Sequence, residues 1–303
     1  MRHDLSRRGF LQSAAIGGAA LALAGSQSAA AEPAQGKPTY CAFTKPLQKL
    51  SFDELAERIA ELGFDGIEAP VRPGGHIEPE HVEDELPKLV EALASRGLTI
   101  GILASGVTSV DQPHTAKVLT TAAKLGIPLY RMAYYKYDLN QPVAKQLDEL
   151  KPMIRDLVAY SREVGISPIY QNHSGRELVG APLWDLHELM RDHPPEDIGV
   201  AFDLGHATVE GGMSWPIQVN LLRPRMRALY VKDFVWHKSG TDWVPLGEGR
   251  SDPKFYQQMR WPNFQGPLSV HVEYLDHKRD ATAEEFLAAF KRDLDQLKSW
   301  QQA

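Results

Sequence analysis

The sequence predicts a single-domain (β/α)8 barrel that follows an N-terminal targeting segment. Short apolar runs alternate with longer amphipathic segments, the alternation recurs eight times, and it extends from residue 39 to residue 303. This is the pattern of successive βα units, and its length is typical of such a barrel. A doubly wound open sheet is less favoured, because it would place a glycine-rich turn after its first strand, where the chain has Thr44-Lys45-Pro46.

The first 31 residues have the features of a twin-arginine signal peptide. Arg7 and Arg8 are adjacent, an Ala/Gly/Leu-rich run follows, and small residues end at Ala31. The apolar run is too short and too rich in glycine to span a bilayer comfortably. We therefore expect cleavage after Ala31, export to the periplasm, no membrane span in the mature protein, and a linker over residues 32–38.

Eight apolar runs are expected to be parallel strands, and a helix is expected after each. The strands are predicted over residues 40–43, 66–70, 99–104, 129–133, 167–172, 198–203, 227–233 and 268–273. The helices are predicted to begin near Ser51, Val82, Asp111, Pro142, Pro182, Trp215, Pro253 and Thr282. Ser51 and Glu54 form a capping-box pattern, and Gly63 is a typical helix stop.

Composition excludes several classes of protein. The formal net charge is -6 and no cluster of Lys and Arg stands out, which argues against a nucleic-acid partner. Cys41 is the single cysteine, so an internal disulfide and a cysteine-based zinc site are both excluded. Residues 237–251 form the longest non-periodic stretch, which we interpret as an active-site loop or lid. The sequence does not decide whether the protein forms a homo-oligomer.

Polar side chains are expected to meet at the C-terminal ends of the strands, where parallel barrels place their active sites. Asp203 ends the sixth predicted strand, and His206 follows it after a glycine. Side chains two positions apart share a face of a strand. The free-energy cost of burying so many charged side chains would be prohibitive unless they pair, bind a metal or face a solvated pocket. The other residues of this set are Glu68, Arg131, Gln171, His173, Tyr230, Lys232, His271 and Glu273.

Loops after the first two strands add positive charge to the same end. Lys45 follows the first strand, and Arg72 and His76 flank two glycines after the second. Cations at a barrel mouth suit a carboxylate, phosphate or polyhydroxylated ligand. Lys45 and Arg72 are alternatively ordinary solvent-facing loop charges. The predicted substrate-binding residues are Lys45, Glu68, Arg72, His76, Arg131, Gln171, Tyr230 and His271.

At these residues the sequence resembles the xylose isomerase-like TIM-barrel superfamily of sugar-phosphate isomerases and epimerases, which also contains endonuclease IV. The resemblance covers the chain after the signal segment. It implies one divalent metal held by Glu, Asp, His and Glu from strands five to eight, with the two glutamates moving a proton between sugar carbons. The motifs that carry it are Gln171-Asn172-His173-Ser174-Gly175, Asp203-Leu204-Gly205-His206, Val231-Lys232-Asp233-Phe234, Pro245-Leu246-Gly247-Glu248-Gly249 and His271-Val272-Glu273.

Two positions depart from the family pattern. Asp203 and Glu273 match the metal ligands of strands six and eight. In contrast, Gln171 occupies the position of the strand-five Glu, and Tyr230 occupies that of the strand-seven His. A Gln can coordinate through its carbonyl oxygen but cannot act as a general base. Two sites therefore remain open. One holds Mn, Mg or Zn on Asp203, Glu273, Gln171 and His206; the other is metal-free and uses Glu273, Lys232 and the histidines.

The resemblance and the residues together predict an exported enzyme that takes a proton next to a carbonyl of a sugar, keto-sugar or sugar acid. Glu273 is the expected base, Lys232 and His206 are expected to stabilise the enediolate oxygen, and His173 is expected to handle a second proton. One family glutamate is missing, so a lyase or hydratase is an alternative to an isomerase or epimerase. A non-catalytic periplasmic sugar-binding protein is another. A nuclease is disfavoured by the negative net charge.

Overall fold

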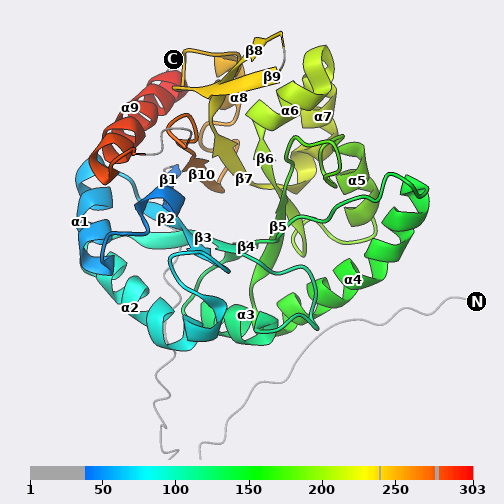
Figure 1. The fold of residues 1–303 in the computed structure, drawn as a ribbon, viewed down its shortest axis with the longest axis horizontal. Helices are drawn as coiled ribbons and strands as arrows, with labels where there is room; N and C mark the ends of the chain where they lie inside the picture. The colour runs from blue at the N-terminus through cyan, green and yellow to red at the C-terminus, as the bar shows by residue number, and fades with distance from the viewer. Residues whose placement is uncertain (1–37, 239, 277–279, 303) are drawn as a thin grey trace, which may run out of the picture. The chain divides into compact units, whose positions relative to one another are not determined.

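The computed structural model is a closed barrel of eight parallel strands surrounded by helices (Figure 1). The strands follow one another around the barrel in chain order. The barrel closes between its first and last strands, where Tyr40 lies opposite Leu268. The predicted TIM barrel is therefore confirmed.

The structure describes part of the chain only. The predicted signal segment and all of the linker except Pro38 lie outside the described residues. None of the helices within the described ranges is long and apolar enough to cross a membrane. The described residues are 38–238, 240–276 and 280–302.

The barrel strands are short and almost fully buried, because helices cover one face and the barrel interior covers the other. They are β1 (Thr39–Phe43), β2 (Gly66–Val71), β3 (Thr99–Ser105), β4 (Leu129–Arg131), β5 (Ser167–Gln171), β6 (Gly199–Asp203), β7 (Met226–Val231) and β10 (Pro267–Val270).

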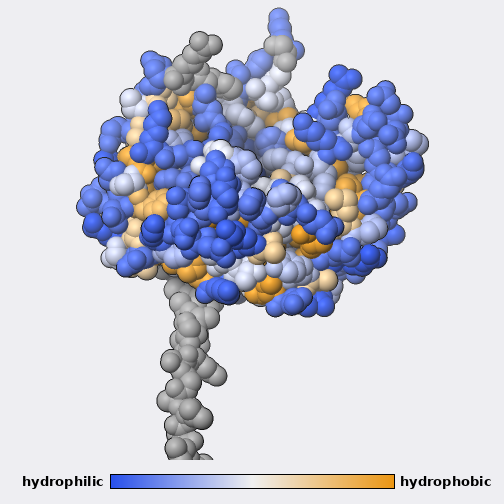
Figure 2. Space-filling view, turned by 60° about the horizontal axis from the view of Figure 1, so that its bottom comes forward, coloured by the Kyte–Doolittle hydropathy of each residue, from blue (hydrophilic) through white to orange (hydrophobic). Residues whose placement is uncertain are grey.

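The helices turn apolar faces toward the strands and polar faces outward. They are α1 (Phe52–Leu62), α2 (Val82–Ser95), α3 (Thr115–Lys124), α4 (Val143–Val164), α5 (Trp184–Met190), α6 (Leu204–Gly211), α7 (Trp215–Leu222), α8 (Pro253–Gln258) and α9 (Ala283–Gln302). The face shown in Figure 2 is accordingly mostly hydrophilic, with small separate apolar spots. The predicted capping box is present, since Glu54 N donates to Ser51 Oγ and the Glu54 carboxylate accepts from Ser51 N. Gly63 ends α1 at φ 82°, as expected.

Two helices differ from the prediction. Helix α6 begins at Leu204, ahead of the helix expected near Trp215, and Asp203 caps it by accepting a hydrogen bond from His206 N at 3.0 Å. Helix α3 begins at Thr115 rather than near Asp111. The Gln112 side chain binds Thr108 N and Gly106 O, and these bonds hold the preceding residues as a loop.

The stretch expected to be a non-periodic loop begins as a hairpin. Strands β8 (Asp233–His237) and β9 (Gly240–Val244) pair antiparallel, so the seventh barrel strand ends at Val231, earlier than expected. Asp233 fixes the segment that follows, because its Oδ2 accepts from the backbone N–H groups of Gly247 and Gly249, each at 3.0 Å. The hairpin and this segment are thus attached to the end of β7.

A small apolar cluster fills the inside of the barrel and forms the floor of the site. It lies on β3 to β7, the strands on one side of the barrel, and the polar residues described below continue the same strand faces toward the C-terminal ends. The cluster consists of Ile102, Leu129, Ile169, Ala201, Ala228 and Tyr230.

Candidate active site

The polar residues of the barrel mouth stand two positions beyond the residues of the floor. Arg131 follows Leu129 on β4, Gln171 follows Ile169 on β5, and Asp203 follows Ala201 on β6. Because side chains alternate along a strand, each pair shares the face that looks into the barrel. Lys232 continues the face of Tyr230 in the same way just after β7. The strand pattern therefore brings the predicted residues to one end of the barrel.

Lys232 lies at the centre of one half of this site. Its Nζ lies 3.2 Å from Asp203 Oδ2, 3.0 Å from Glu273 Oε2 and 2.7 Å from His206 Nε2. Only 2% of the Lys232 side chain is exposed, whereas Glu273 keeps 22% of its side chain exposed. The ammonium is thus buried among three acceptors, and one of them reaches solvent.

The charge of Lys232 is stabilised by these neighbours. Burial alone would lower the pKa of Lys232, but Asp203 and Glu273 raise it above its ordinary value. The ring of Trp243, on β9, covers the ammonium with its centroid 4.2 Å from Nζ, an attractive cation–π geometry. Burial also favours the neutral form of Glu273, yet Lys232 and then His271 hold the pKa of Glu273 well below its usual range. Both groups are therefore ionised at neutral pH.

Glu68 organises the other half of the site. Its Oε1 accepts from Tyr230 OH at 2.8 Å and lies 3.2 Å from Arg131 Nε. Its Oε2 accepts from Ser269 at 2.7 Å and lies 3.0 Å from His271 Nε2. Burial opposes ionisation, but His271 and Arg131 lower the pKa of Glu68 to about 2. In return, Glu68 raises the pKa of His271 against the effect of burial.

Two further contacts connect the halves. Gln171 Nε2 donates to Asp203 Oδ2 at 3.0 Å, and Gln171 Oε1 accepts from Arg131 at 3.0 Å and from Tyr134. Just after β10, His271 Nδ1 lies 3.6 Å from Glu273 Oε1. The side chains thus form a closed circuit of contacts, which we call the charged ring. Its members are Glu68, Arg131, Gln171, Asp203, Lys232, Glu273 and His271.

Two histidines with closely packed, tilted rings border the charged ring. The rings of His173 and His206 lie 3.8 Å apart, and Ser174 Oγ is hydrogen-bonded to His206 Nδ1. Burial, and then Lys232, hold the pKa of His206 well below its ordinary value and lower that of His173. Because the Lys232 ammonium can only donate, His206 Nε2 is the acceptor of that bond. His173 Nδ1 contacts Ser174 O at 2.8 Å, a carbonyl that only accepts, so its Nε2 has a free lone pair.

Comparison with known proteins identifies the family. The model of the family described as xylose isomerase-like TIM barrel matches residues 56–293. The chain belongs to this family. No curated protein sequence matches it significantly.

Solved structures of the same fold have little sequence in common with this chain. A putative xylose isomerase from Rhodospirillum rubrum has a TM-score of 0.70 and 16% identity, over 86% of this chain and 99% of that chain. The probable 3-DHS dehydratase AsbF of Bacillus anthracis has a TM-score of 0.67 and 16% identity, over 86% and 98%. The 3-keto-D-glucoside 4-epimerase YcjR of E. coli has a TM-score of 0.64 and 15% identity, over 87% and 100%. Identities this low establish a shared fold.

The donors at the barrel mouth do not fit the divalent metal that the family resemblance implies. Gln171 Oε1 already accepts from the Arg131 guanidinium, and the Tyr230 hydroxyl donates to Glu68. Asp203, Glu273 and His206 all contact the Lys232 ammonium, which a second cation would have to displace. Within the described residues no three His, Cys, Asp or Glu side chains are arranged to hold a metal. The set Asp203, Glu273, Gln171 and His206 therefore lacks the free donors of a metal site.

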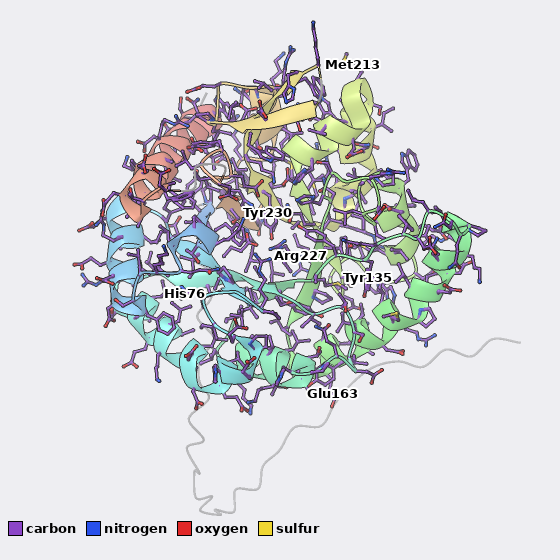
Figure 3. The ribbon with its side chains drawn as sticks, in the orientation of Figure 1. His76, Tyr135, Glu163, Met213, Arg227 and Tyr230 are labelled. Atoms are coloured by element: carbon purple, nitrogen blue, oxygen red, sulfur yellow. The ribbon has the colours of Figure 1, made fainter. Side chains whose placement is uncertain are left out.

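The predicted loop residues do not all reach the charged ring. His76 lies toward β2 and α1, away from Tyr230 near the middle of the barrel (Figure 3), and its Nε2 lies 3.1 Å from Leu50 O. Lys45 pairs with Asp276 at 2.8 Å on the exposed rim. Arg72 reaches the mouth, where its guanidinium lies 5.8 Å from the centre of the Phe43 ring. Lys45 and His76 are thus removed from the site, and Arg72 borders it.

Sequence reasoning missed four residues of the site. Ser269 lies two positions before His271, so strand alternation would have identified it. Ser174 lies in the motif Gln171-Asn172-His173-Ser174-Gly175, of which Gln171 and His173 were predicted as site residues. Tyr134 follows the end of β4 in a loop, and Trp243 belongs to the unrecognised hairpin, so neither had a periodic signal. The four residues contact Glu68, His206, Gln171 and Lys232, respectively.

Proposed function

We propose that the protein is an enzyme that removes a proton from the carbon next to a carbonyl group of a sugar, keto-sugar or sugar acid. The observation that supports this most directly is the 3.0 Å contact between Glu273, which reaches solvent, and the buried Lys232 ammonium. A carboxylate base beside a fixed cation is the pairing that enolisation requires, because negative charge develops on the carbonyl oxygen as the proton leaves.

In the proposed reaction, Glu273 accepts the proton, the C–H electron pair forms a C=C bond, and the C=O π pair moves onto the carbonyl oxygen, giving an enediolate. Lys232 stabilises that oxygen, and neutral His206 keeps Lys232 in position. His173 Nε2 accepts a proton from a substrate hydroxyl and returns it. Protonation of the former carbonyl carbon gives an isomer, protonation of the original carbon on its opposite face gives an epimer, and departure of a β-hydroxyl as water, with a proton taken from Glu273, gives an elimination product. No step of this scheme uses a metal.

The site lacks a second carboxylate at the family's two glutamate positions, and this favours elimination by a lyase or hydratase over symmetric epimerisation. Gln171 cannot accept a proton, so Glu273 is the carboxylate that remains at the family's two glutamate positions. The family membership and the fold shared with the 3-keto-D-glucoside 4-epimerase YcjR, a D-psicose 3-epimerase and the probable 3-DHS dehydratase AsbF support this reaction class as a proposal.

The role of Glu273 is tested by Glu273→Gln, assayed for deuterium uptake from D2O and for turnover on a panel of keto-sugars. We expect turnover to fall by about 10²- to 10⁴-fold, the usual contribution of general base catalysis. Asp276→Asn is the matched control, because Asp276 pairs with Lys45 on the rim, and it should retain wild-type rates. Unchanged turnover in Glu273→Gln would exclude Glu273 as the base.

A non-catalytic sugar-binding protein is the second candidate, and Gln171 and Tyr230 at two usual ligand positions favour it. Sugar-dependent thermal stabilisation with no turnover and no deuterium exchange across the panel would support this candidate. Any turnover that Glu273→Gln abolishes would exclude it.

We also propose that the precursor is exported to the periplasm by the twin-arginine pathway, on the evidence of Arg7, Arg8 and the apolar run that follows. Fractionation of cells that produce the full chain tests this. The double substitution Arg7→Lys, Arg8→Lys should retain the precursor in the cytoplasm. Its appearance in the periplasm at the wild-type level would contradict the proposal.

A further inference from the structure

Arg72 differs from the other cations of the barrel mouth because no carboxylate of the described residues pairs with it. Arg131 pairs with Glu68, Lys232 pairs with Asp203 and Glu273, and His271 lies against Glu68. Within the described part of the chain, the Arg72 guanidinium makes no hydrogen bond or ion pair. Its contact is with Phe43, whose ring centre lies 5.8 Å from Arg72 Cζ and 5.5 Å from Arg131 Cζ. Two guanidinium groups thus share one aromatic ring.

Holding Arg72 in this place has an electrostatic cost. The side chain is partly buried, and burial, followed by the charge of Arg131, lowers the pKa of Arg72. The group nevertheless remains charged, because a guanidinium does not lose its proton in proteins. An anion placed against Arg72 would remove the repulsion from Arg131 and replace the lost hydration.

The backbone around Arg72 is built to hold this position. Arg72 N donates to Ile77 O at 3.2 Å, Gly75 N donates to Arg72 O at 2.7 Å, and Gly74 N donates to the Glu78 carboxylate at 2.8 Å. A Cβ on Gly75 would lie 2.8 Å from both Arg72 O and Pro70 O, so the turn closes only with glycine. The backbone of Arg72 is therefore fixed before a ligand arrives, so binding has to order the side chain alone.

We propose that Arg72 binds the carboxylate group of the substrate, so that the substrate is a sugar acid. This inference rests on the proposed function and adds the substrate class. The planar guanidinium matches a carboxylate in a bidentate pair. The carboxylates of the charged ring are already partnered, and Arg72 adds one positive charge that a single carboxylate neutralises. A phosphate dianion would call for more unpaired donors than Arg72 alone supplies.

The test is calorimetric titration of the mature protein with D-glucuronate, D-galacturonate, D-glucose, D-galactose and D-glucose 6-phosphate. At least one uronate should bind more tightly than its neutral counterpart. Arg72→Gln should lower the affinity for that uronate by about 10- to 100-fold, the contribution of a charged hydrogen-bond pair, and should leave the binding of the neutral sugar unchanged. Lys45→Gln is the matched control, since Lys45 is the rim cation paired with Asp276, and it should bind like the wild type.

Several results would overturn the inference. They are no binding of either uronate, equal binding of uronate and neutral sugar, tighter binding of the sugar phosphate, or an equal loss of acid and neutral ligands in Arg72→Gln. These results are separate from those of the catalytic test. A uronate could bind in an Arg72-dependent way while Glu273→Gln leaves turnover unchanged. That combination would support this inference and contradict the proposed function.

Discussion

Glu68 is a fully buried carboxylate whose two oxygens contact four side chains. Each contact uses a different partner, and two of the partners, Arg131 and His271, carry or can carry positive charge. Removing one side of a buried ion pair leaves an uncompensated charge, and that loss is far larger than the net contribution of the pair. Glu68 therefore holds the floor and the ring of the site together.

Replacing Glu68 should consequently cost much more stability than replacing one of its neutral partners. We expect Glu68→Ala to lower the free energy of unfolding by about 3–5 kcal/mol. Ser269→Ala, which removes a single neutral donor, should cost about 1 kcal/mol. Urea denaturation followed by circular dichroism measures both. Equal losses in the two variants would show that Glu68 does not have this central role.

His271 should make stability depend on pH in one direction. Its pKa is raised in the folded protein, chiefly because Glu68 outweighs burial, so the folded state binds the proton more tightly than the unfolded chain. The resulting stability is present below the ordinary histidine pKa and is lost as the pH rises through the raised value. The difference in Tm between wild type and His271→Gln should shrink over that interval. A difference that grows with pH would contradict this assignment.

Strand alternation predicted which side chains would line the mouth but could not predict how they would pair. Asp203, Lys232 and Glu273 were placed together because each lies at a strand end. The bond between Tyr230 and Glu68 joins strands that are not neighbours in the barrel. That contact depends on the diameter of the closed barrel, which no local pattern specifies.

Among the elements, the hairpin β8–β9 has the most direct effect on the site. It begins one residue after Lys232, and Trp243 on its second strand covers the ammonium. Its attachment depends on Gly249, because a Cβ there would lie 2.3 Å from Asp233 Oδ1 and 2.4 Å from Phe234 O. The hairpin therefore cannot keep its place if the following turn is altered.

We accordingly expect Gly249→Ala to lower both Tm and turnover, since the clash would displace the segment that Asp233 binds. The neighbouring Glu248→Ala is the control, because its side chain is 64% exposed and lies 3.6 Å from Arg292. That control should stay within a few tenths of a kcal/mol of wild type. Thermal denaturation and steady-state rates measure both effects. Wild-type turnover in Gly249→Ala would show that the hairpin is not held by this turn.

Helix ends were predictable where a local signal existed, as the Ser51 cap and the Gly63 stop show. Helix α6 was missed because it starts directly on the strand end and contains a glycine in its first turn. The hairpin was missed although β-branched and aromatic residues flank Gly240, a pattern typical of strands. The glycines at 247 and 249 in the same stretch favoured the interpretation of residues 237–251 as a loop.

At the scale of the whole molecule, the barrel places the Lys232 ammonium among the side chains that the family resemblance assigns to a metal. If Lys232 supplies the positive charge, dialysis against a chelator should leave turnover and Tm unchanged. Added Mn²⁺ should likewise leave both quantities unchanged. Metal content measured on the purified protein, together with rates before and after chelation, tests this. A rate lost on chelation and restored by one metal would contradict it.

The closed circuit of contacts at the barrel mouth also limits how the sequence can change during evolution. Each member of the charged ring has two neighbours within it, so a single replacement removes one of the two ring contacts of each neighbour, whereas a compensating change next to it can restore one of those contacts. We expect related chains to vary at these positions in linked pairs, such as Gln171 with Arg131 or Lys232 with Glu273. Converting this ring into a metal-holding site would then require coupled substitutions on neighbouring strands.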